Sequence, residues 1–401
     1  MSAPKHSVAL VVGTRPEVVK MAPVYLALRG SPHLAPVLVS TGQHREMLDQ
    51  AFGVFGLRPD LDLNLMQPGQ GLAELSSRVL LRMTEALRTL RPAAVLVQGD
   101  TTTALASALA AFYERIAIGH VEAGLRTYNL GAPWPEEMNR RLTDPIARWC
   151  FAPTSWSADN LKAERIPPDR IHVTGNTVID ALFWVREKIR RAGVAAATVA
   201  GRCQIPAAFA AKFLRDDAPR GRWILITGHR RESFGGGFEN ICHAIAELAA
   251  RYPDLGLLYP VHLNPNVQEP VRRLLGGNPR VALIPPVNYE DFIWLMDRCT
   301  FVLSDSGGVQ EEAPSLGKPV LVLRETTERP EGVGAGTCML VGTDPGRILG
   351  ESARLLDDAG EYLSRSRLAN PYGNGAAALQ VRSILERDVG GGGETGGPAG
   401  R

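Results

Sequence analysis

The chain has 401 residues, of which 45% are apolar and 21% charged, and 44 basic against 42 acidic side chains leave a net charge of +2. This length predicts two domains, each with enough apolar surface to bury a core of its own. The composition excludes collagen, a coiled coil and a disordered protein, and the balanced charge favours neither a nucleic-acid nor a membrane partner.

The apolar stretches are as long as strands and well short of the ~18 residues that a membrane span needs. The first of them, Val8–Val12, is too short for the apolar region of a signal peptide. Five scattered cysteines without a CxxC pair predict neither a disulfide framework nor a zinc site. We therefore expect a cytoplasmic protein.

Apolar runs alternate with helical stretches through the first half of the chain. The runs are continuous in Val, Ile, Leu and Ala, as in a parallel sheet with helices on both faces. The expected strands are 7–12, 35–39, 93–97, 116–121 and 149–152. The expected helices are 16–29, 72–90, 102–115 and 135–147.

The second half repeats this alternation after a helix at 177–192 and an alanine-rich, weakly patterned segment. Its expected strands are 223–227, 255–259, 281–284, 301–304 and 319–322, and its expected helices are 238–251, 265–275, 289–299 and 309–316. Two such blocks predict two doubly wound α/β domains of Rossmann type. We expect domains at 1–182 and 183–371, a helix at 372–388 that crosses back to the first domain, and a disordered glycine-rich tail at 389–401.

Ligands of such sheets bind where strands end and loops lead into helices. After the first strand, Gly13 permits a tight turn and Pro16 suits the first helical position. Arg15 and Lys20 add positive charge to a helix start that favours anions, although both could be solvated surface cations. Since GxGxxG and GxxxxGK[ST] are both absent here, a nicotinamide cofactor and a P-loop are disfavoured.

Three carboxylates, Asp100, Glu122 and Glu136, are candidates to gather at the same sheet edge. Acidic groups in one cleft have pKa values that are pushed apart, which divides acid and base roles between them. Two alternatives are open: Asp100 could cap a helix together with Thr101 or Thr102, and all three acids could pair with Arg126, Arg140 and Arg141.

In the second half, His229 directly follows a strand and could serve as a general base or as a hydrogen-bond donor to a phosphate. His262 follows the next strand, where a structural histidine is at least as plausible.

The segment Ser306-Gly307-Gly308 lies between a strand and a helix, an arrangement that suits a diphosphate. The Glu312 carboxylate could accept hydrogen bonds from both hydroxyls of a ribose. Arg324 and Arg329 either add cations to this edge or form surface ion pairs.

Together these segments resemble the non-hydrolysing UDP-N-acetylglucosamine 2-epimerases of bacteria. The resemblance spans residues 13 to 373 and is carried by GTRPEVVKMAP (13–23), QHREMLDQ (43–50), GDTTTALA (99–106), GHVEAGLRT (119–127), PWPEEMNR (133–140), TGNTVIDAL (174–182), TGHRRESFG (227–235), YPVHLNPNV (259–267), LSDSGGVQEEAPSLGKPVLVLR (303–324), TTERPEGV (326–333) and NPYG (370–373). It implies a GT-B-like fold of two Rossmann-type domains facing a central cleft, a homodimer, and chemistry without a cofactor or an essential metal.

The resemblance also implies roles for individual residues. The catalytic group would be Asp100, Glu122, Glu136 and His229. The substrate contacts would be Arg15, Lys20, Asp100, Glu122, His229, Val287, Phe292, Ser306, Gly307, Gly308, Glu312 and Arg329. A second, activating UDP-GlcNAc would be bound by Gln43, Gln70, Glu136, Arg230 and His262. Gln98, Glu46 and Gly69 depart from residues frequent in the family.

The implied reaction converts UDP-GlcNAc reversibly into UDP-ManNAc. UDP would leave by anti elimination to give 2-acetamidoglucal, and its re-addition with protonation on the other face would invert C2. Four alternatives are open: an epimerase of another UDP-2-acetamido sugar, a hydrolysing epimerase that releases ManNAc and UDP, a GT-B glycosyltransferase, and a non-catalytic nucleotide-sugar sensor.

Overall fold

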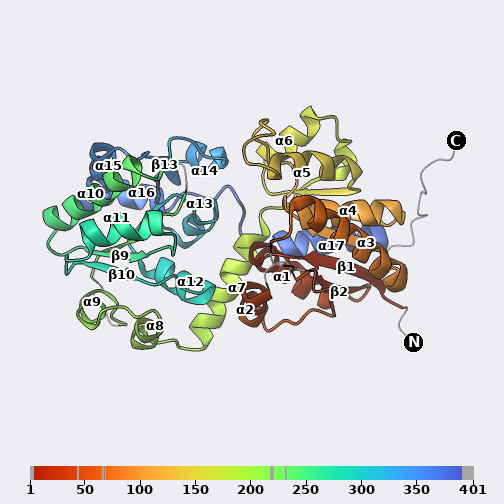
Figure 1. Cartoon of the computed structure of the whole chain (residues 1–401), viewed down its shortest axis with the longest axis horizontal. Helices are drawn as coiled ribbons and strands as arrows, with labels where there is room; N and C mark the ends of the chain where they lie inside the picture. Colours follow the sequence, from red (N-terminus) through yellow and green to blue (C-terminus); the bar gives the residue numbers. More distant parts are fainter. Residues whose placement is uncertain are drawn as a thin grey trace. The chain divides into compact units, whose positions relative to one another are not determined.

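The structure is a computed structural model, and it describes residues 4–42, 45–65, 67, 69–216, 221–230 and 233–390. The chain divides into two compact units: unit 1 comprises Met1–Phe183 and Gly373–Arg401, and unit 2 comprises Trp184–Tyr372. Each unit is a parallel sheet with helices on both of its faces, as Figure 1 shows.

Unit 1 contains a seven-stranded sheet in the order β3-β2-β1-β4-β5-β6-β7, with every neighbouring pair parallel. Its strands are β1 His6–Val12, β2 Leu34–Ser40, β3 Leu61–Asp62, β4 Ala94–Gln98, β5 Ala117–Val121, β6 Trp149–Ala152 and β7 Ile171–Val173. The sequence predicted five of these strands. It missed the outermost two, β3 and β7, because their sequences, Leu-Asp and Ile-His-Val, are interrupted by a polar residue and do not form an apolar run.

The helices of unit 1 are α1 Arg15–Arg29, α2 Arg45–Phe55, α3 Leu72–Leu90, α4 Thr102–Tyr113, α5 Glu136–Thr143, α6 Ser155–Ala163 and α17 Ala377–Val389, with short 3₁₀ turns η1 Asp144–Ile146 and η2 Pro168–Arg170. Helix α7, Thr177–Arg191, runs across the boundary into unit 2.

The sequence did not predict α2 and α6, and several predicted helix bounds in unit 1 are wrong. The helix expected at 102–115 ends as α4 at Tyr113. The helix expected at 135–147 ends as α5 at Thr143, because Pro145 lacks the N–H that would continue the α-helical ladder, and η1 follows. Helix α1 begins at Arg15, since Thr14 is its N-cap, so Pro16 occupies the second helical position and not the first.

Unit 2 contains a six-stranded parallel sheet in the order β10-β9-β8-β11-β12-β13. Its strands are β8 Trp223–Thr227, β9 Gly256–Pro260, β10 Val281–Ile284, β11 Val302–Ser304, β12 Val320–Val322 and β13 Cys338–Leu340. Here the sequence missed only β13, a three-residue strand at the edge of the sheet.

The helices of unit 2 are α8 Ala196–Arg202, α9 Ala207–Phe213, α10 Gly236–Arg251, α11 Pro265–Leu275, α12 Tyr289–Arg298, α13 Gly307–Glu312, α14 Pro330–Gly334, α15 Pro345–Asp357 and α16 Ala359–Ser366, with the 3₁₀ turn η4 Ala313–Leu316. The helix expected at 309–316 is wrong in its bounds: α13 starts at Gly307 and gives way to η4, which contains Pro314. The segment taken as weakly patterned holds α8 and α9.

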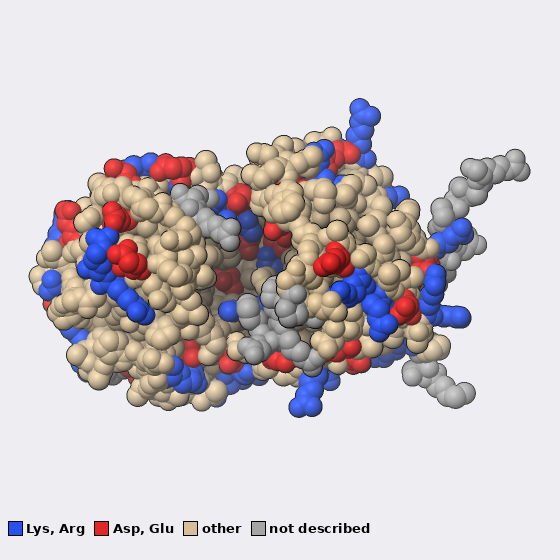
Figure 2. All heavy atoms as spheres, in the orientation of Figure 1, with Lys and Arg blue, Asp and Glu red and all other residues tan. Residues whose placement is uncertain are grey.

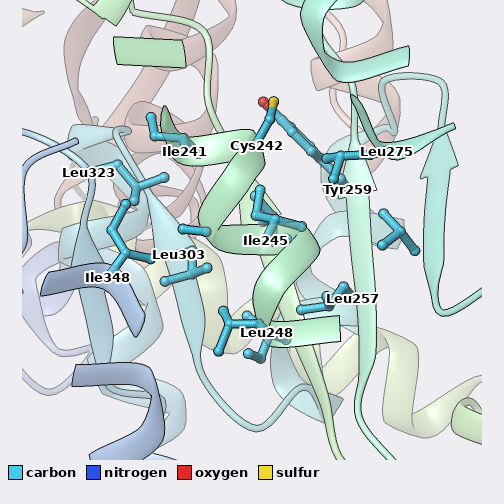
Figure 3. Packing of buried hydrophobic residues seen from close by; sticks show 14 of the residues in the cluster. Ile241, Cys242, Ile245, Leu248, Leu257, Tyr259, Leu275, Leu303, Leu323 and Ile348 are labelled. Atoms are coloured by element: carbon cyan, nitrogen blue, oxygen red, sulfur yellow. The ribbon is translucent and has the colours of Figure 1, made fainter. Parts of the chain in front are cut away.

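The core of unit 2 lies between its sheet and helices such as α10 and α15. Figure 3 shows Ile245 and Leu248 of α10 on the side of Leu257 of β9, and Ile241 of α10 on the side of Leu323. These side chains are at most 3% exposed. The spacing of the α10 residues, i, i+4 and i+7, puts them on one helix face, and burying each such side chain is worth about 1.5–3 kcal/mol.

The C-terminal helix α17 packs in unit 1, where it contacts α1. Its side chains Val381 and Leu385 are fully buried, and Asp388 accepts a hydrogen bond of 2.7 Å from Trp149 Nε1. The last eleven residues of the glycine-rich tail lie outside the described part of the chain.

Charged side chains of both signs lie on the surface of the molecule. Figure 2 shows Lys and Arg side chains interspersed with Asp and Glu on the displayed face. Within the described residues, no helix is both long enough and apolar enough to cross a membrane.

Candidate functional site

In both sheets the strand order reverses in the middle, between β1 and β4 in unit 1 and between β8 and β11 in unit 2. Ligands of open α/β sheets bind beyond the carboxyl ends of the strands at such a reversal. The loops that follow these four strands begin with Gly13, Gly99, Gly228 and Asp305. Each unit therefore has its own group of candidate residues, and we describe the two groups separately.

In unit 1, the carboxylate of Glu17 ties the loop after β1 to the loop after β4. It accepts hydrogen bonds from the backbone N–H groups of Gly13 (2.8 Å) and Thr14 (2.6 Å) and from the Thr101 hydroxyl (2.6 Å). Burial raises the pKa of Glu17, although these hydrogen bonds oppose the shift. Gly13 is needed here, because a Cβ atom at this position would lie 2.5 Å from Thr41 Oγ1.

Asp100 follows Gly99 at the carboxyl end of β4. Its Oδ2 accepts hydrogen bonds from Arg140 Nε (2.9 Å) and Nη2 (2.6 Å), and its backbone oxygen accepts one from Asn139 Nδ2 (2.7 Å). Thr101, and not Asp100, caps α4 by accepting a hydrogen bond from the N–H of Ala104. The ion pair that the sequence left open for Asp100 is therefore formed, with Arg140.

Glu122 follows β5 and lies beside this loop. A Cβ atom built on Gly99 would lie 3.8 Å from Glu122 Oε2. Oε1 of the same carboxylate lies 2.5 Å from Lys20 Nζ, and Oε2 accepts a hydrogen bond from the Gln98 amide. In this structure the Lys20 ammonium, expected at a nucleotide, thus contacts a carboxylate of unit 1.

Glu136 is the first residue of α5, the helix whose Asn139 and Arg140 hold Asp100. Its Oε2 is buried and has no hydrogen-bond partner among the described residues. The arginines expected as alternative partners pair elsewhere: Arg126 with Asp144 and Glu164, and Arg141 with Glu164. Lys20, Asp100 and Glu122 are thus brought together at the carboxyl edge of the sheet, and α5 ties Glu136 to the same loop.

The other candidates of unit 1 lie on neighbouring elements. Arg15 is half-buried at the start of α1. Gln70 lies before α3, and its Oε1 accepts a hydrogen bond of 3.1 Å from Arg78 Nη1. Gln43 lies outside the described residues, as does the side chain of Glu46.

In unit 2, Asp305 binds the loop that carries His229. Its Oδ2 accepts hydrogen bonds from the backbone N–H groups of His229 (2.7 Å) and Arg230 (2.8 Å), and its Oδ1 lies 3.4 Å from His229 Nδ1. The His229 ring stacks on His262 with 5.3 Å between their centroids. Desolvation, together with His262 and Arg230, lowers the pKa of His229, so this ring is neutral near pH 7.

The segment Ser306-Gly307-Gly308 leads from β11 into α13, as the sequence predicted. A Cβ atom on Gly307 would lie 3.1 Å from the guanidinium carbon of Arg329, so this cation lies directly over the glycine. Arg329 Nε also donates to Glu311 Oε1 at 2.9 Å. The loop therefore combines a helix start with a nearby cation, a combination that suits an anionic ligand.

Glu312 lies further along α13 and is buried. It accepts a hydrogen bond from the hydroxyl of Tyr289, the first residue of α12, the helix that also carries Phe292. Val287 lies half-buried in the loop between β10 and α12. Glu312, Phe292 and Val287 thus belong to one corner of unit 2.

Arg324 is buried and donates to Glu328 Oε2 at 2.8 Å. Although burial opposes the shift, Arg324 lowers the pKa of Glu328 to about 2. Arg230 lies 3.8 Å from the same glutamate, so Glu328 links the loop after β8 to the loop after β12. Arg324 therefore forms an ion pair, but a largely buried one and not the surface pair considered as an alternative.

Sequence reasoning missed two residues that hold candidate groups, Asp305 on His229 and Tyr289 on Glu312. It singled out Gln98 only as a departure from the family, whereas the Gln98 amide donates to Glu122. Asp305 could have been found, because a carboxylate directly after a strand and before Ser-Gly-Gly faces the same sheet edge. Tyr289 could not, since a single polar residue at a helix start has no distinctive pattern.

The sequence model of the UDP-N-acetylglucosamine 2-epimerase family matches residues 26–386. The UDP-N-acetylglucosamine 2-epimerase of Salmonella typhimurium is 54% identical over 379 residues, which cover 94% of this chain and 98% of that protein. The chain belongs to the UDP-N-acetylglucosamine 2-epimerase family. The enzyme of that name from Escherichia coli K12 is 52% identical over 95% of this chain and 98% of its own length.

Solved structures of epimerases agree with this assignment. The Neisseria meningitidis UDP-GlcNAc 2-epimerase bound to UDP-GlcNAc superimposes with a TM-score of 0.85 at 46% identity, covering 95% of this chain and all of that one. The Methanocaldococcus jannaschii UDP-GlcNAc 2-epimerase, in complex with UDP-GlcNAc and UDP, gives a TM-score of 0.75 at 31% identity, covering 95% and 99%. The prediction of a GT-B-like fold built from two Rossmann-type domains is confirmed.

Proposed function

We propose that this epimerase family member converts UDP-GlcNAc reversibly into UDP-ManNAc without hydrolysing it. The proposal is carried by the placement of Asp100 and Glu122 after the neighbouring strands β4 and β5, in a chain 54% identical to an enzyme of that name. A Cβ atom on Gly99, the residue before Asp100, would lie 3.8 Å from Glu122 Oε2. The diphosphate would bind to the Ser306–Gly308 loop and Arg329 of unit 2. The sugar would be acted on by the carboxylates of unit 1.

The chemistry requires acidic groups because C2 of the sugar is not next to a carbonyl, so direct removal of its proton would be slow. Weakening the C1–O bond gives C1 oxocarbenium character and acidifies the C2 proton. A base then takes that proton, the C2–H electron pair forms the C1=C2 bond, and UDP leaves with the C1–O pair. Protonation of 2-acetamidoglucal on its other face and return of the UDP oxygen to C1 complete the inversion.

We assign the proton transfers at C2 to Asp100 and Glu122, with Glu136 assisting. General acid–base catalysis of this kind contributes about 10²–10⁴-fold. A neutral His229 can donate a hydrogen bond to the departing diphosphate, and Arg15 offers it a positive charge. The described residues contain no group of three His, Cys, Asp or Glu side chains that could hold a metal ion, and no step here uses one.

The test is proton NMR of the pure protein with UDP-GlcNAc in deuterated buffer. We expect the C2 proton signal to disappear as solvent deuterium enters, with UDP-ManNAc appearing and no free sugar. Free ManNAc together with UDP would instead show a hydrolysing epimerase. An unchanged spectrum would fit a sensor, or a glycosyltransferase that awaits an acceptor, and would overturn the proposal. If the protein turns over only a differently substituted UDP-2-acetamido sugar, that sugar is its substrate in place of UDP-GlcNAc.

We also propose that a second UDP-GlcNAc activates the enzyme through Gln43, Gln70, Glu136, Arg230 and His262. In unit 2, Arg230 directly follows His229, and His262 stacks on the His229 ring. A ligand bound to Arg230 and His262 would therefore affect His229, a residue proposed to take part in catalysis. The initial rate from UDP-ManNAc should then rise when UDP-GlcNAc is added. A simple hyperbolic progress without activation would count against this site.

We propose in addition that the protein is a homodimer and that it is located in the cytoplasm. All five cysteines are buried free thiols, which fits a reducing compartment. Sedimentation of the purified protein would show a mass of two chains, and a single-chain mass would contradict the dimer.

A further inference from the structure

Beneath the proposed catalytic loop of unit 1 lies a buried histidine with two acceptors. The His120 side chain, on β5, is fully buried. Its Nδ1 lies 2.5 Å from Asp144 Oδ1, and its Nε2 lies 2.7 Å from the backbone oxygen of Gly99. Gly99 is the residue before Asp100, and His120 itself lies two residues before Glu122.

The partners of His120 fix where its protons are. A carbonyl oxygen can only accept a hydrogen bond, so Nε2 carries a proton that it donates to Gly99. The second oxygen of Asp144, Oδ2, accepts a hydrogen bond of 2.6 Å from Arg126 Nη2. Because Asp144 pairs through Oδ2 with the buried Arg126 guanidinium, it is a carboxylate, and Nδ1 of His120 donates to its Oδ1.

Charged groups of both signs surround the ring. Arg126 also binds Glu164, from the end of α6, at 2.7 Å and 2.9 Å. Arg141 Nε lies 3.5 Å from Glu164 as well, so Glu164 has a second cation beside it. Asp144 faces His120 with one carboxylate oxygen and Arg126 with the other. The Cys150 thiol, which donates weakly to the backbone oxygen of Asp144, has a pKa raised by burial and adds no charge.

We propose that His120 is held as an imidazolium that positions the Gly99 carbonyl, and through it the Asp100 carboxylate, for the reaction. Gly99 is fixed at both ends, because its N–H donates to Val121 O at 3.0 Å while its oxygen accepts from His120. Gly99, the residue before Asp100, has a φ of +70°, and Glu122 has a φ of +69°. Both values lie in the left-handed region of backbone conformation, so the backbone at both proposed catalytic carboxylates has an uncommon conformation next to His120. Small displacements of catalytic groups cost up to about 100-fold in rate.

The charge of His120 can be measured on the wild-type protein, independently of activity. Nitrogen-15 NMR of protein labelled at histidine should show both His120 ring nitrogens protonated at pH 7.5, where a histidine of ordinary pKa is mostly neutral. A ring with one unprotonated nitrogen at that pH would overturn the imidazolium. Because this measurement needs no turnover, it separates failure of this inference from failure of the proposed function on which the positioning role rests.

The positioning role is tested with His120→Gln, which removes the charge but keeps an amide donor. We expect kcat to fall 10- to 100-fold, with the KM for UDP-GlcNAc and the affinity for UDP within threefold of wild type. The matched control is His172→Gln on β7 of the same sheet, half-buried against Phe151, which should leave kcat unchanged. A wild-type kcat in His120→Gln, or equal losses in both variants, would refute the role.

If His120→Gln does not fold, Asp144→Asn takes its place. This variant keeps the ring but removes the carboxylate that holds the second proton. We expect its His120 to become neutral at pH 7.5 and its kcat to fall by the same factor at unchanged UDP affinity. A neutral ring with a wild-type kcat would contradict the positioning role.

Discussion

Each carboxylate proposed to act on the sugar has a different set of partners. Asp100 is held by Arg140, and Glu122 is held by Lys20 and Gln98. Glu136 Oε2 has no hydrogen-bond partner in the part of the chain that the structure describes. Different environments are the means by which neighbouring acids take different roles in proton transfer.

The first prediction at this scale concerns Asp100→Asn. The amide keeps the shape of the side chain but cannot take a proton, so kcat should fall by about 10²–10⁴-fold, and exchange of the C2 proton with solvent deuterium should fall with it. The affinity for UDP, measured by calorimetry, should stay within twofold because the proposed diphosphate loop lies in unit 2. Asp159→Asn, an exposed aspartate on α6, is the matched control with wild-type activity. Full C2 exchange by Asp100→Asn would remove this residue from the mechanism.

The second prediction concerns the Lys20–Glu122 ion pair, whose side chains are 13% and 5% exposed. Lys20→Met leaves a buried carboxylate without its cation, which costs about 3 kcal/mol or more and should lower Tm by roughly 5–10 °C. The double variant Lys20→Met/Glu122→Gln removes both charges and should recover part of that loss. Equal Tm values for Lys20→Met and wild type would show that the pair contributes nothing to stability.

Among the strands, the central ones were predictable from sequence, whereas three of the edge strands were not. Strands such as β1 and β4 are continuous apolar runs, and the three-residue strands β11 and β12 also lie in such runs. The missed strands β3, β7 and β13 lie at sheet edges and are partly exposed. The candidate site residues follow the predictable strands, so their placement could be inferred. The contact of Lys20 with Glu122 could not, because 102 residues separate them and spacing along the chain does not encode such contacts.

The third prediction concerns the junction of α7 and α17. Asp180, on α7, accepts hydrogen bonds from the first N–H groups of α17, those of Ala377 (3.2 Å) and Ala378 (2.9 Å). Burial raises the pKa of Asp180 to about 6. Because the unfolded chain binds this proton only below about pH 4, the contribution of Asp180 to stability falls as the pH rises from about 4 to about 6 and is constant above that.

Asp180→Asn cannot titrate, so its Tm relative to wild type should increase across that pH interval, by the equivalent of about 2–3 kcal/mol. Thermal melts from pH 4 to pH 7 measure the difference. Asp159→Asn, again the exposed control, should show no such trend. A Tm difference between Asp180→Asn and wild type that does not change with pH would disprove the raised pKa.

Across the whole molecule, the two units share the same kind of sheet topology but carry different side chains at the candidate sites. Each sheet reverses its strand order in the middle. In unit 1, Asp100 follows β4 at the reversal, and Glu122, after the next strand β5, pairs with Lys20 of α1. In unit 2, His229 and the Ser306–Gly308 loop follow the two strands at the reversal. Both sets of residues are present in a chain that shares 46–54% identity with named UDP-GlcNAc 2-epimerases. We therefore propose that unit 1 transfers the proton at C2 and that unit 2 retains UDP.

The most direct test of this account follows the anomeric oxygen. UDP-GlcNAc labelled with ¹⁸O between C1 and the β-phosphorus is incubated with the enzyme, and the label is located by phosphorus NMR. If UDP leaves C1 and returns, as proposed, the label should spread from the bridging position to the non-bridging oxygens of the β-phosphate while C2 is inverted. Inversion of C2 with all of the label still in the bridge would contradict elimination of UDP.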